Sequence, residues 1–180
     1  MTGEHDKQLL ARIAGGDKEA LRVLYDRHAP GLLRFVETWS IDRNDAADIV
    51  HDCMIDVWKS AGRFGGRSTV KSWIYSIARN KSVDRNRKRG RTVLKEPDET
   101  VADDALQPDE VVAAFQDAEG LRACIQCLSE KQRTAIHLAF FEDLTYAEIA
   151  AMEGCPVGTI KTRIMHAKKQ LFECVSKRRG

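Results

Sequence analysis

Residues 145–169, TYAEIAAMEGCPVGTIKTRIMHAKK, decide the fold of the C-terminal part of this chain. Thr145 and Glu148 form a T-x-x-E capping box, which predicts the start of a short helix. The sequence Gly154-Cys155-Pro156 predicts its end, because proline lacks the amide donor and glycine tolerates left-handed geometry. A second helix is expected from about Val157. The whole stretch is therefore typical of a helix-turn-helix.

The second helix of this motif has two different faces. Its apolar side carries Ile160, Ile164 and Ala167. The opposite side carries Lys161, Thr162, Arg163, His166, Lys168 and Lys169. A helix with hydrogen-bonding and basic groups on one face suits the major groove of DNA. The alternative is a surface helical hairpin whose charged face only contacts solvent.

The composition of the 180 residues sets further limits on the class of protein. The chain is 43% hydrophobic, which is enough for one medium domain or two small ones. No apolar run approaches the roughly 20 residues of a membrane helix, and the start MTGEHDKQLL lacks the apolar core of a signal peptide. We therefore expect a cytoplasmic protein without membrane insertion. The five cysteines are then expected to be reduced thiols.

The formal net charge of +2 hides a strong segregation of charge along the chain. Residues 61–93 and 121–180 are basic, whereas residues 94–120 are strongly acidic. Two basic blocks separated by an acidic one predict two nucleic-acid contacts joined by a segment that DNA repels. Two unrelated solvated faces are the alternative.

Nearly every periodic segment has helical spacing, and no hairpin signal appears. Asp17 predicts a helix start, Pro30 a break, and residues 45–59 and 69–88 two further helices. Ser129 and Gln132 form a second capping box in the C-terminal part. The predicted fold class is therefore all-α, with two small helical domains joined by an acidic linker. The expected division is residues 1–92, linker 93–117 and residues 118–180.

The predicted helix within residues 45–60, DAADIVHDCMIDVWKS, has an acidic stripe. The apolar residues of this segment follow helical spacing and predict a core-facing side. On the opposite side, carboxylates recur every three or four residues, at Asp45, Asp48, Asp52 and Asp56. Four like charges in a row cost stability, which a cationic partner would recover, and Ile55 beside them indicates a protein interface. A solvated acidic face is the alternative.

Residues 62–91 combine basic and aromatic side chains. Trp73, Ile74, Ile77 and Ala78 mark the expected buried side of the long helix. The cations are Lys71, Arg79, Lys81, Arg85, Arg87, Lys88, Arg89 and Arg91. Together with Phe64, Trp73 and Tyr75 they suit a phosphate backbone with unstacked bases. For Trp73, a core position is the favoured interpretation, and a core tryptophan can still shape a base pocket.

These segments, in this order, resemble bacterial sigma factors of the sigma-70 class, of the compact extracytoplasmic-function type. LYDRHAPGLLRF and DAADIVHDCMIDVWKS look like the first conserved segments of sigma domain 2. FGGRSTVKSWIYSIARNKSVDRNRKR is similar to the segment that melts and reads the −10 element. LSEKQRTAIHLAFFEDLTYAEIAAMEGCPVGTIKTRIMHAKKQL is similar to domain 4, which reads the −35 element. The resemblance covers nearly the whole chain.

The resemblance implies a set of sites and partners. Core RNA polymerase would be bound through its β′ coiled coil and β flap, with the β′ contact at Asp45, Asp48, Asp52, Ile55 and Asp56. The −10 DNA strand would meet Phe64, Ser68, Thr69, Trp73, Ile77, Asn80, Lys81 and Arg85. The −35 duplex would meet Thr159, Lys161, Thr162, Arg163, Met165, His166, Lys168 and Lys169. An anti-sigma factor is the expected regulator, since no sensory domain is present.

Two positions depart from the usual pattern of the resemblance. His166 stands where many relatives carry arginine, which predicts a weaker or pH-sensitive phosphate contact. Gly65-Gly66 predicts a more mobile loop for base capture.

Other chemistry is not expected from this sequence. Cys124-x-x-Cys127 lacks a second pair of metal ligands, and Cys124 falls on an apolar helix face. His28, His51 and His137 stand alone in the sequence, without a carboxylate partner. Neither a catalytic constellation, a cofactor nor a metal site is therefore predicted. A stand-alone helix-turn-helix regulator is the alternative function, and it leaves residues 45–91 unexplained.

Overall fold

The computed structural model describes residues 2–39, 42–88 and 118–179, and all regular elements within these ranges are helices. The all-α prediction is therefore confirmed. The chain divides into two compact units, Met1–Leu94 and Lys95–Gly180. The predicted acidic linker, residues 93–117, lies outside the described residues. Within the described ranges, no helix has the length and apolar character needed to cross a membrane.

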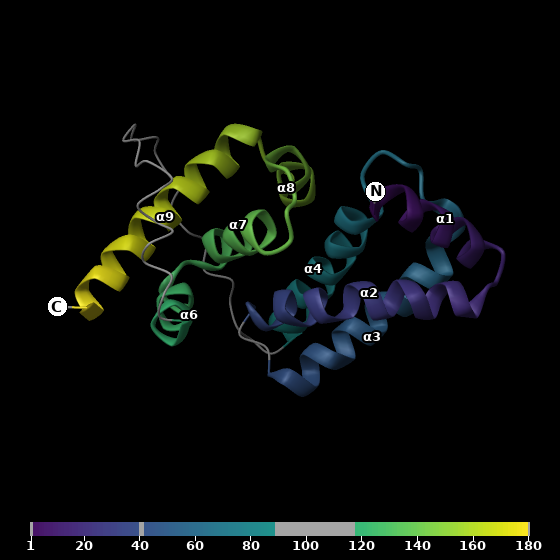
Figure 1. The fold of residues 1–180 in the computed structure, drawn as a ribbon, viewed down its shortest axis with the longest axis horizontal. Coiled ribbons are helices and arrows are strands. Elements are labelled where there is room, and N and C mark those ends of the chain that lie inside the picture. Colours follow the sequence, from purple (N-terminus) through teal and green to yellow (C-terminus); the bar gives the residue numbers. More distant parts are fainter. Residues whose placement is uncertain (1, 40–41, 89–117, 180) are drawn as a thin grey trace. The chain divides into compact units, whose positions relative to one another are not determined.

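The first unit contains four α-helices and a short 3₁₀ turn among its described residues (Figure 1). They are α1 (Thr2–Ala14), α2 (Lys18–Glu37), α3 (Arg43–Ser60), η1 (Ala61–Arg63) and α4 (Val70–Lys88). Helix α2 packs against α1 and α3, and α3 in turn packs against α4. The helices enclose one apolar core.

The start of α2 is fixed by Asp17, as predicted. Its carboxylate accepts hydrogen bonds from the backbone N–H groups of Glu19 and Ala20, at 3.0 and 3.1 Å. The Ala20 amide and the Arg12 guanidinium lower the pKa of Asp17 below its usual value. Helix α1 was not predicted from the sequence, although its buried Leu9, Leu10 and Ile13 have helical spacing.

The predicted break near Pro30 is wrong, because α2 runs through Pro30 without interruption. Proline in a helix interior removes one hydrogen bond and costs about 3 kcal/mol or more. Buried side chains on both sides of it, Leu24 before and Leu32 and Phe35 after, offset that cost. Tertiary packing therefore overrides the local signal.

The core of the first unit is built from all four helices. Phe35 of α2 and Tyr75 of α4 are both buried, with ring centroids 5.3 Å apart. From α3, Cys53 is also buried, and its thiol donates to the backbone carbonyl of Ile74 at 3.5 Å. Helix α4 is held at its end by Asn86, whose amide donates to the Trp39 carbonyl at 3.2 Å.

A buried polar cluster joins α1 to α2. Asp6 lies 3.0 Å from Nε2 of His28, and its other oxygen pairs with Arg27. The prediction that His28 stands without a carboxylate is therefore wrong, and His137 likewise lies 3.6 Å from Glu142. The contact between Asp6 and His28 could not be predicted from local sequence patterns, because 22 residues separate the two side chains. Burial lowers the pKa of His28, and Asp6 opposes this only in part.

The described part of the second unit also consists of helices (Figure 1). They are α6 (Ala118–Cys127), α7 (Glu130–Phe140), α8 (Tyr146–Glu153) and α9 (Val157–Arg179). Both predicted capping boxes are present, Ser129 with Gln132 and Thr145 with Glu148. Gly154 ends α8 with a φ of 65°, in the left-handed region that favours glycine. The predicted helix-turn-helix is therefore formed by α8 and α9.

The core of the second unit is formed by facing stripes of α7, α8 and α9. Leu138, Ile149 and Ile160, one from each helix, are fully buried. The turn between α6 and α7 is fixed by Arg133, which donates to the Leu128 and Gln126 carbonyls at 2.9 and 3.2 Å. Burial lowers the pKa of this guanidinium.

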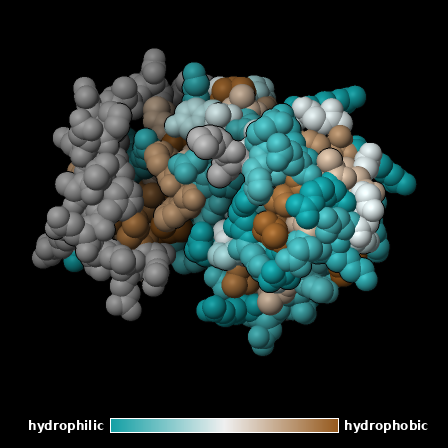
Figure 2. Space-filling view, turned by 45° about the vertical axis from the view of Figure 1, so that its right-hand side comes forward, coloured by the Kyte–Doolittle hydropathy of each residue, from teal (hydrophilic) through white to brown (hydrophobic). Residues whose placement is uncertain are grey.

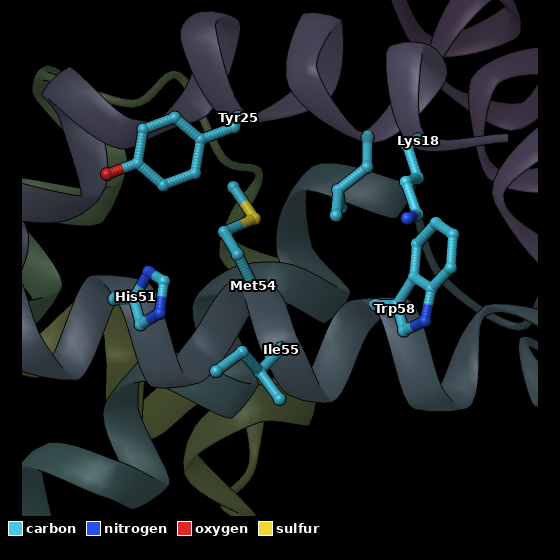
Figure 3. A pocket seen from close by; sticks show the side chains of 7 residues that line it. Lys18, Tyr25, His51, Met54, Ile55 and Trp58 are labelled. Atoms are coloured by element: carbon cyan, nitrogen blue, oxygen red, sulfur yellow. The ribbon is translucent and has the colours of Figure 1, made fainter.

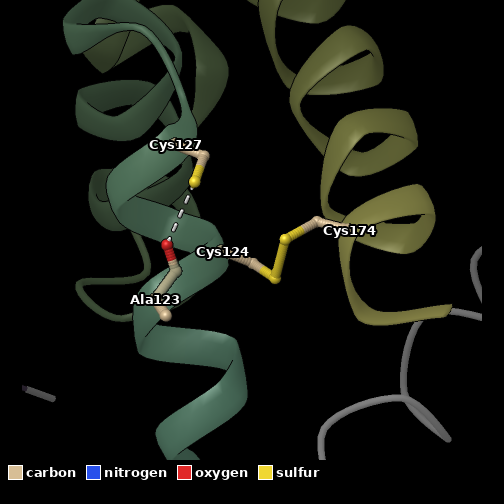
Figure 4. The surroundings of a disulfide bond; sticks show 4 residues. All are labelled: Ala123, Cys124, Cys127 and Cys174. Atoms are coloured by element: carbon tan, nitrogen blue, oxygen red, sulfur yellow. Dashed lines mark hydrogen bonds between the residues drawn. A yellow bond between two sulfur atoms is a disulfide. The ribbon is translucent and has the colours of Figure 1, made fainter. Parts of the chain in front are cut away.

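Cys124 of α6 and Cys174 of α9 form a disulfide, so the prediction of five reduced thiols is wrong for these two (Figure 4). They are 50 residues apart in sequence, but packing of α6 on α9 brings their Cα atoms within 5.8 Å. The predicted buried position of Cys124 is confirmed. Cys53, Cys127 and Cys155 are free thiols.

Candidate functional site

The acidic stripe of α3 divides into two pairs of carboxylates. Asp48 and Asp52 are exposed, and neither forms an ion pair within the described ranges. Asp45 and Asp56 are partly buried and bind cations of α4 (Arg85 and Lys81). Of the four predicted docking carboxylates, two thus face solvent and two lie at the contact between α3 and α4.

A groove of about 400 Å³ runs between α2 and α3 (Figure 3). The exposed Asp48 and Asp52 lie within one turn of His51, one of the residues of α3 that line it. Tyr25 and Ile55, 37% and 36% exposed, are two of its apolar side chains. In Figure 3, Met54 extends from α3 toward Tyr25 of α2, and Lys18 points toward Trp58. The complete lining is Lys18, Leu21, Tyr25, His51, Met54, Ile55 and Trp58.

Only Ile55 was predicted as part of this surface. Leu21 and Tyr25 are four residues apart on α2, and this spacing is typical of a core-facing side. Met54 likewise follows the apolar period of α3. Side chains at the edge of a core and side chains in a groove share the same periodicity. The sequence therefore contains no signal that separates them.

The predicted −10 residues are distributed along α4 and the loop before it. Phe64, Ser68, Thr69 and Trp73 lie at or before the helix start, whereas Ile77, Asn80, Lys81 and Arg85 lie further along the helix. The rings of Phe64, from the loop after η1, and Trp73 have centroids 5.1 Å apart and are tilted by 51°. Both are half-buried, as is Ile77, so Trp73 and Ile77 lie at the rim and Ile74 and Ala78 fill the core. The remaining members of the predicted pocket, Ser68, Thr69 and Asn80, are exposed.

Thr69 also has a structural role at this helix start. Its Oγ1 accepts a hydrogen bond from the Ser72 amide at 3.2 Å and donates to the Ser72 hydroxyl at 3.0 Å. This is how an N-cap residue satisfies a free helix amide. The loop residues before Thr69 are exposed, and Gly66 has a φ of 67°. The cap therefore fixes where the loop ends and the basic helix begins.

In the second unit, the predicted −35 residues lie on α9 and differ in exposure. Lys161 and Lys169 are exposed, whereas Thr159, Thr162, Met165 and Lys168 are half-buried. The Thr162 hydroxyl donates to the Gly158 carbonyl at 3.1 Å. Lys168 lies over the Phe140 ring, with its amine 4.8 Å from the ring centroid.

Two of the predicted readers point toward protein. Nη1 of Arg163 lies 3.7 Å from the Glu153 carboxylate and 3.8 Å from the Cys155 sulfur. Nε2 of His166 is buried and has no hydrogen-bond partner among the described residues. The predicted reading face of α9 therefore contains two kinds of side chain. Lys161 and Lys169 contact solvent, whereas Arg163 contacts α8 and the ring nitrogen of His166 is buried.

The face of the molecule shown in Figure 2 is largely hydrophilic. On the face shown in Figure 2, hydrophobic side chains reach the surface in separate patches among hydrophilic ones. Phe140, Phe141 and Phe172 of the second unit are also exposed.

Two family models match this chain. Residues 24–92 match sigma-70 region 2, and residues 118–171 match sigma-70 region 4. The first range includes the basic helix α4 and the groove residues from Tyr25 to Trp58. The second range includes the helix-turn-helix. Fold and sites therefore define a factor for the initiation of transcription.

Curated relatives agree with this class. The RNA polymerase sigma-H factor of Pseudomonas aeruginosa is 31% identical, over 95% of this chain and 94% of that protein. The extracytoplasmic-function (ECF) sigma factor RpoE of Cereibacter sphaeroides is 35% identical, over 89% and 88%. The chain belongs to the sigma-70 family of RNA polymerase sigma factors, of the extracytoplasmic-function type. Its function is to direct promoter-specific initiation of transcription, and the relatives favour this over a stand-alone regulator.

Solved structures share the fold. The sigma factor RpoE of Bartonella quintana, in complex with the anti-sigma factor NepR, aligns with a TM-score of 0.67 at 30% identity. That alignment covers 86% of this chain and 96% of the other. CnrH, in complex with the cytosolic domain of CnrY, aligns with a TM-score of 0.71 at 21% identity, over 96% and 98%.

Proposed function

We propose that the two units divide the work of promoter recognition. Residues 1–92 bind core polymerase and the −10 element, residues 118–180 bind the −35 element, and residues 93–117 connect them. The protein then acts in the cytoplasm, and binding free energy replaces chemical catalysis. The exposed carboxylates beside the α2–α3 groove are the observation that carries this proposal.

The polymerase contact is assigned to the groove and to Asp48 and Asp52. An apolar groove flanked by two solvent-facing carboxylates fits a helical partner that has apolar side chains and adjacent cations. The β′ coiled coil is the expected partner by family resemblance. Ile55 and Tyr25 would supply buried contact area, and the two carboxylates would supply charge complementarity.

The −10 contact is assigned to α4 and the loop before it. Phe64 and Trp73 offer half-buried rings at the rim, and Asn80 offers an exposed amide two turns further along α4. Stacking of a base on an aromatic side chain contributes about 1–3 kcal/mol. This stabilisation offsets the cost of unstacking a base, which is a few kcal/mol.

The −35 contact is assigned to the exposed side of α9. Lys161 and Lys169 are the cations that phosphates reach without displacing a protein partner. Thr159, Thr162 and Met165 are half-buried and close to the helix start, where a recognition helix contacts base edges. We assign Arg163 and His166 mainly to positioning of α9, and DNA contact by these two side chains is secondary.

An anti-sigma factor is the proposed regulator of this protein. The relative from Bartonella quintana was solved in complex with one, and it aligns over 86% of this chain. An inhibitor that covers the α2–α3 groove would prevent polymerase binding. Purification of the protein from its unstressed host without any inhibitory partner would contradict this part of the proposal.

Run-off transcription with core polymerase tests the proposed function. The variant Asp48→Lys/Asp52→Lys should lose most of its transcript, because both changes place cations opposite a basic partner. Glu4→Lys/Asp26→Lys is the matched control, since it reverses two exposed charges of the same unit at residues that do not line the groove. Equal transcript from all three proteins would refute the docking assignment.

A further inference from the structure

Two ion pairs connect the polymerase-docking helix to the DNA-binding helix. Nζ of Lys81 lies 2.7 Å from Oδ2 of Asp56, and Nη1 of Arg85 lies 2.7 Å from Oδ1 of Asp45. The carboxylates belong to α3 and the cations to α4. All four residues were assigned to binding sites, yet in this structure they bind one another.

The pairs are accessible enough to exchange partners. The side chains of Lys81 and Asp56 are 26% and 45% exposed, and those of Arg85 and Asp45 are 30% and 17% exposed. Ion pairs of this exposure are weak, because water screens them. A phosphate or a protein cation can therefore compete for either member.

Each carboxylate also lowers the attraction of its cation for phosphate. A cation with an anion at 2.7 Å presents a weak dipole to a distant charge rather than a full positive charge. The free chain thus exposes fewer effective charges along α4 than its sequence suggests. Lys81 and Arg85 of α4 are both affected in this way by carboxylates of α3.

We propose that Asp45 and Asp56 mask the DNA-binding cations of α4 in the free protein and release them when polymerase binds. This inference rests on the proposed function, because it needs a cationic surface of polymerase at α3. When that surface attracts Asp45 and Asp56, Lys81 and Arg85 become available for the −10 phosphates. Coupling of this kind is reciprocal, so bound DNA strengthens polymerase docking by the same factor.

The first test measures binding of the free, full-length protein to a fluorescent oligothymidylate of about 15 nucleotides at low salt. Asp45→Asn and Asp56→Asn should each raise the affinity about twofold to fivefold, which corresponds to the strength of one exposed pair. The gain should shrink as salt increases. Asp48→Asn and Asp52→Asn are matched controls, with the same charge change on the same helix, and should alter the affinity by less.

A double-mutant cycle separates masking from a general charge effect. In a Lys81→Gln background, Asp56→Asn should give no more gain than Asp52→Asn, because the cation to be released is gone. If Asp56→Asn instead weakens binding, the carboxylate positions Lys81 and the inference is wrong. If all four Asp→Asn variants give the same gain, masking is also refuted.

A second test uses the holoenzyme formed with saturating core polymerase. There the wild type and Asp56→Asn should bind the oligonucleotide within about twofold of each other, since polymerase has already displaced the carboxylates. A difference in the holoenzyme as large as in the free protein would overturn the inference. Failure of wild-type protein to bind polymerase at all would instead overturn the proposed function. Because Asp56 is the more exposed carboxylate, its variant should fold even if Asp45→Asn does not.

Discussion

Arg163 of α9 and Glu153 of α8 form an ion pair inside the helix-turn-helix, with 3.7 Å between Nη1 and Oε2. The two side chains are only 12% and 6% exposed. A charge pair this protected from water fixes the angle between the two helices more than it serves a ligand. Removal of one partner leaves a charge of the other in a site with little water.

We expect Arg163→Met to affect the stability of the second unit more than its DNA binding. The substitution should lower the free energy of unfolding of the second unit by about 1–3 kcal/mol, because the Glu153 carboxylate loses the Arg163 guanidinium from a site with little water. Lys161→Met, at an exposed position, should leave stability within about 0.5 kcal/mol and weaken promoter binding by the holoenzyme. Urea denaturation and salt-dependent promoter binding measure the two effects. A stable Arg163→Met protein that binds poorly would instead make Arg163 a direct DNA contact.

The partly exposed side chains of the α2–α3 groove should contribute to polymerase binding. Ile55→Ala and Tyr25→Ala should each weaken core polymerase binding about five- to tenfold, as truncation of an interface anchor does. Each should change the stability of the free chain by less than truncation of a buried residue. Phe172→Ala, equally exposed at 37% but located on the second unit, is the control. Affinities of labelled protein for core polymerase check this, and an unchanged affinity for both groove variants would disprove the assignment.

Reduction of the disulfide should destabilise the second unit alone. A bridge that closes a loop between residues 50 apart contributes roughly 2–4 kcal/mol through the entropy of the unfolded chain. Cys124→Ala/Cys174→Ala should reproduce the loss without a reductant, whereas Cys127→Ser/Cys155→Ser should remain sensitive to reductant. The measurement is the denaturation midpoint of each unit with and without reductant. Equal stability of the oxidised and reduced protein would show that the disulfide does not stabilise the second unit.

Acid should destabilise the first unit through His28. Burial holds the pKa of this imidazole below the usual 6.5 in the folded state. As the pH falls below about 6.5, the unfolded chain therefore takes up a proton first, and the free energy of unfolding decreases. One group contributes a slope of at most about 1.4 kcal/mol per pH unit. Denaturation at pH 7.5 and 5.5 should show a smaller loss for His28→Gln than for wild type, with exposed His51→Gln as the control. An identical loss in the three proteins would exclude His28 as the cause.

Local signals predicted much of this fold because their partners are close in sequence. The Thr145–Glu148 and Ser129–Gln132 boxes and Gly154 each act within one helical turn, so the residues alone define the helix ends. Pro30 is the exception, since packing on both sides outweighs its local effect. Long-range pairs gave no such signal. Cys124 with Cys174, and Asp6 with His28, meet only after the helices have packed.

The candidate sites were predictable to a different degree. Helical spacing placed the carboxylates of α3 and the cations of α4 on the correct helices. It gave no information that Asp45 and Asp56 would face Arg85 and Lys81, because that depends on how the two helices cross. The groove was missed for a related reason, since periodicity gives the side of a helix but not the distance to its neighbour.

Cys53 supplies a natural reporter for opening of the first unit. Burial raises the pKa of its thiol to about 12, and alkylating reagents react with the thiolate. At neutral pH, modification of Cys53 must therefore wait for a fluctuation that separates α3 from α4, whereas exposed Cys127 reacts at once. The difference between the two labelling rates measures how often the first unit opens transiently, with no engineered probe.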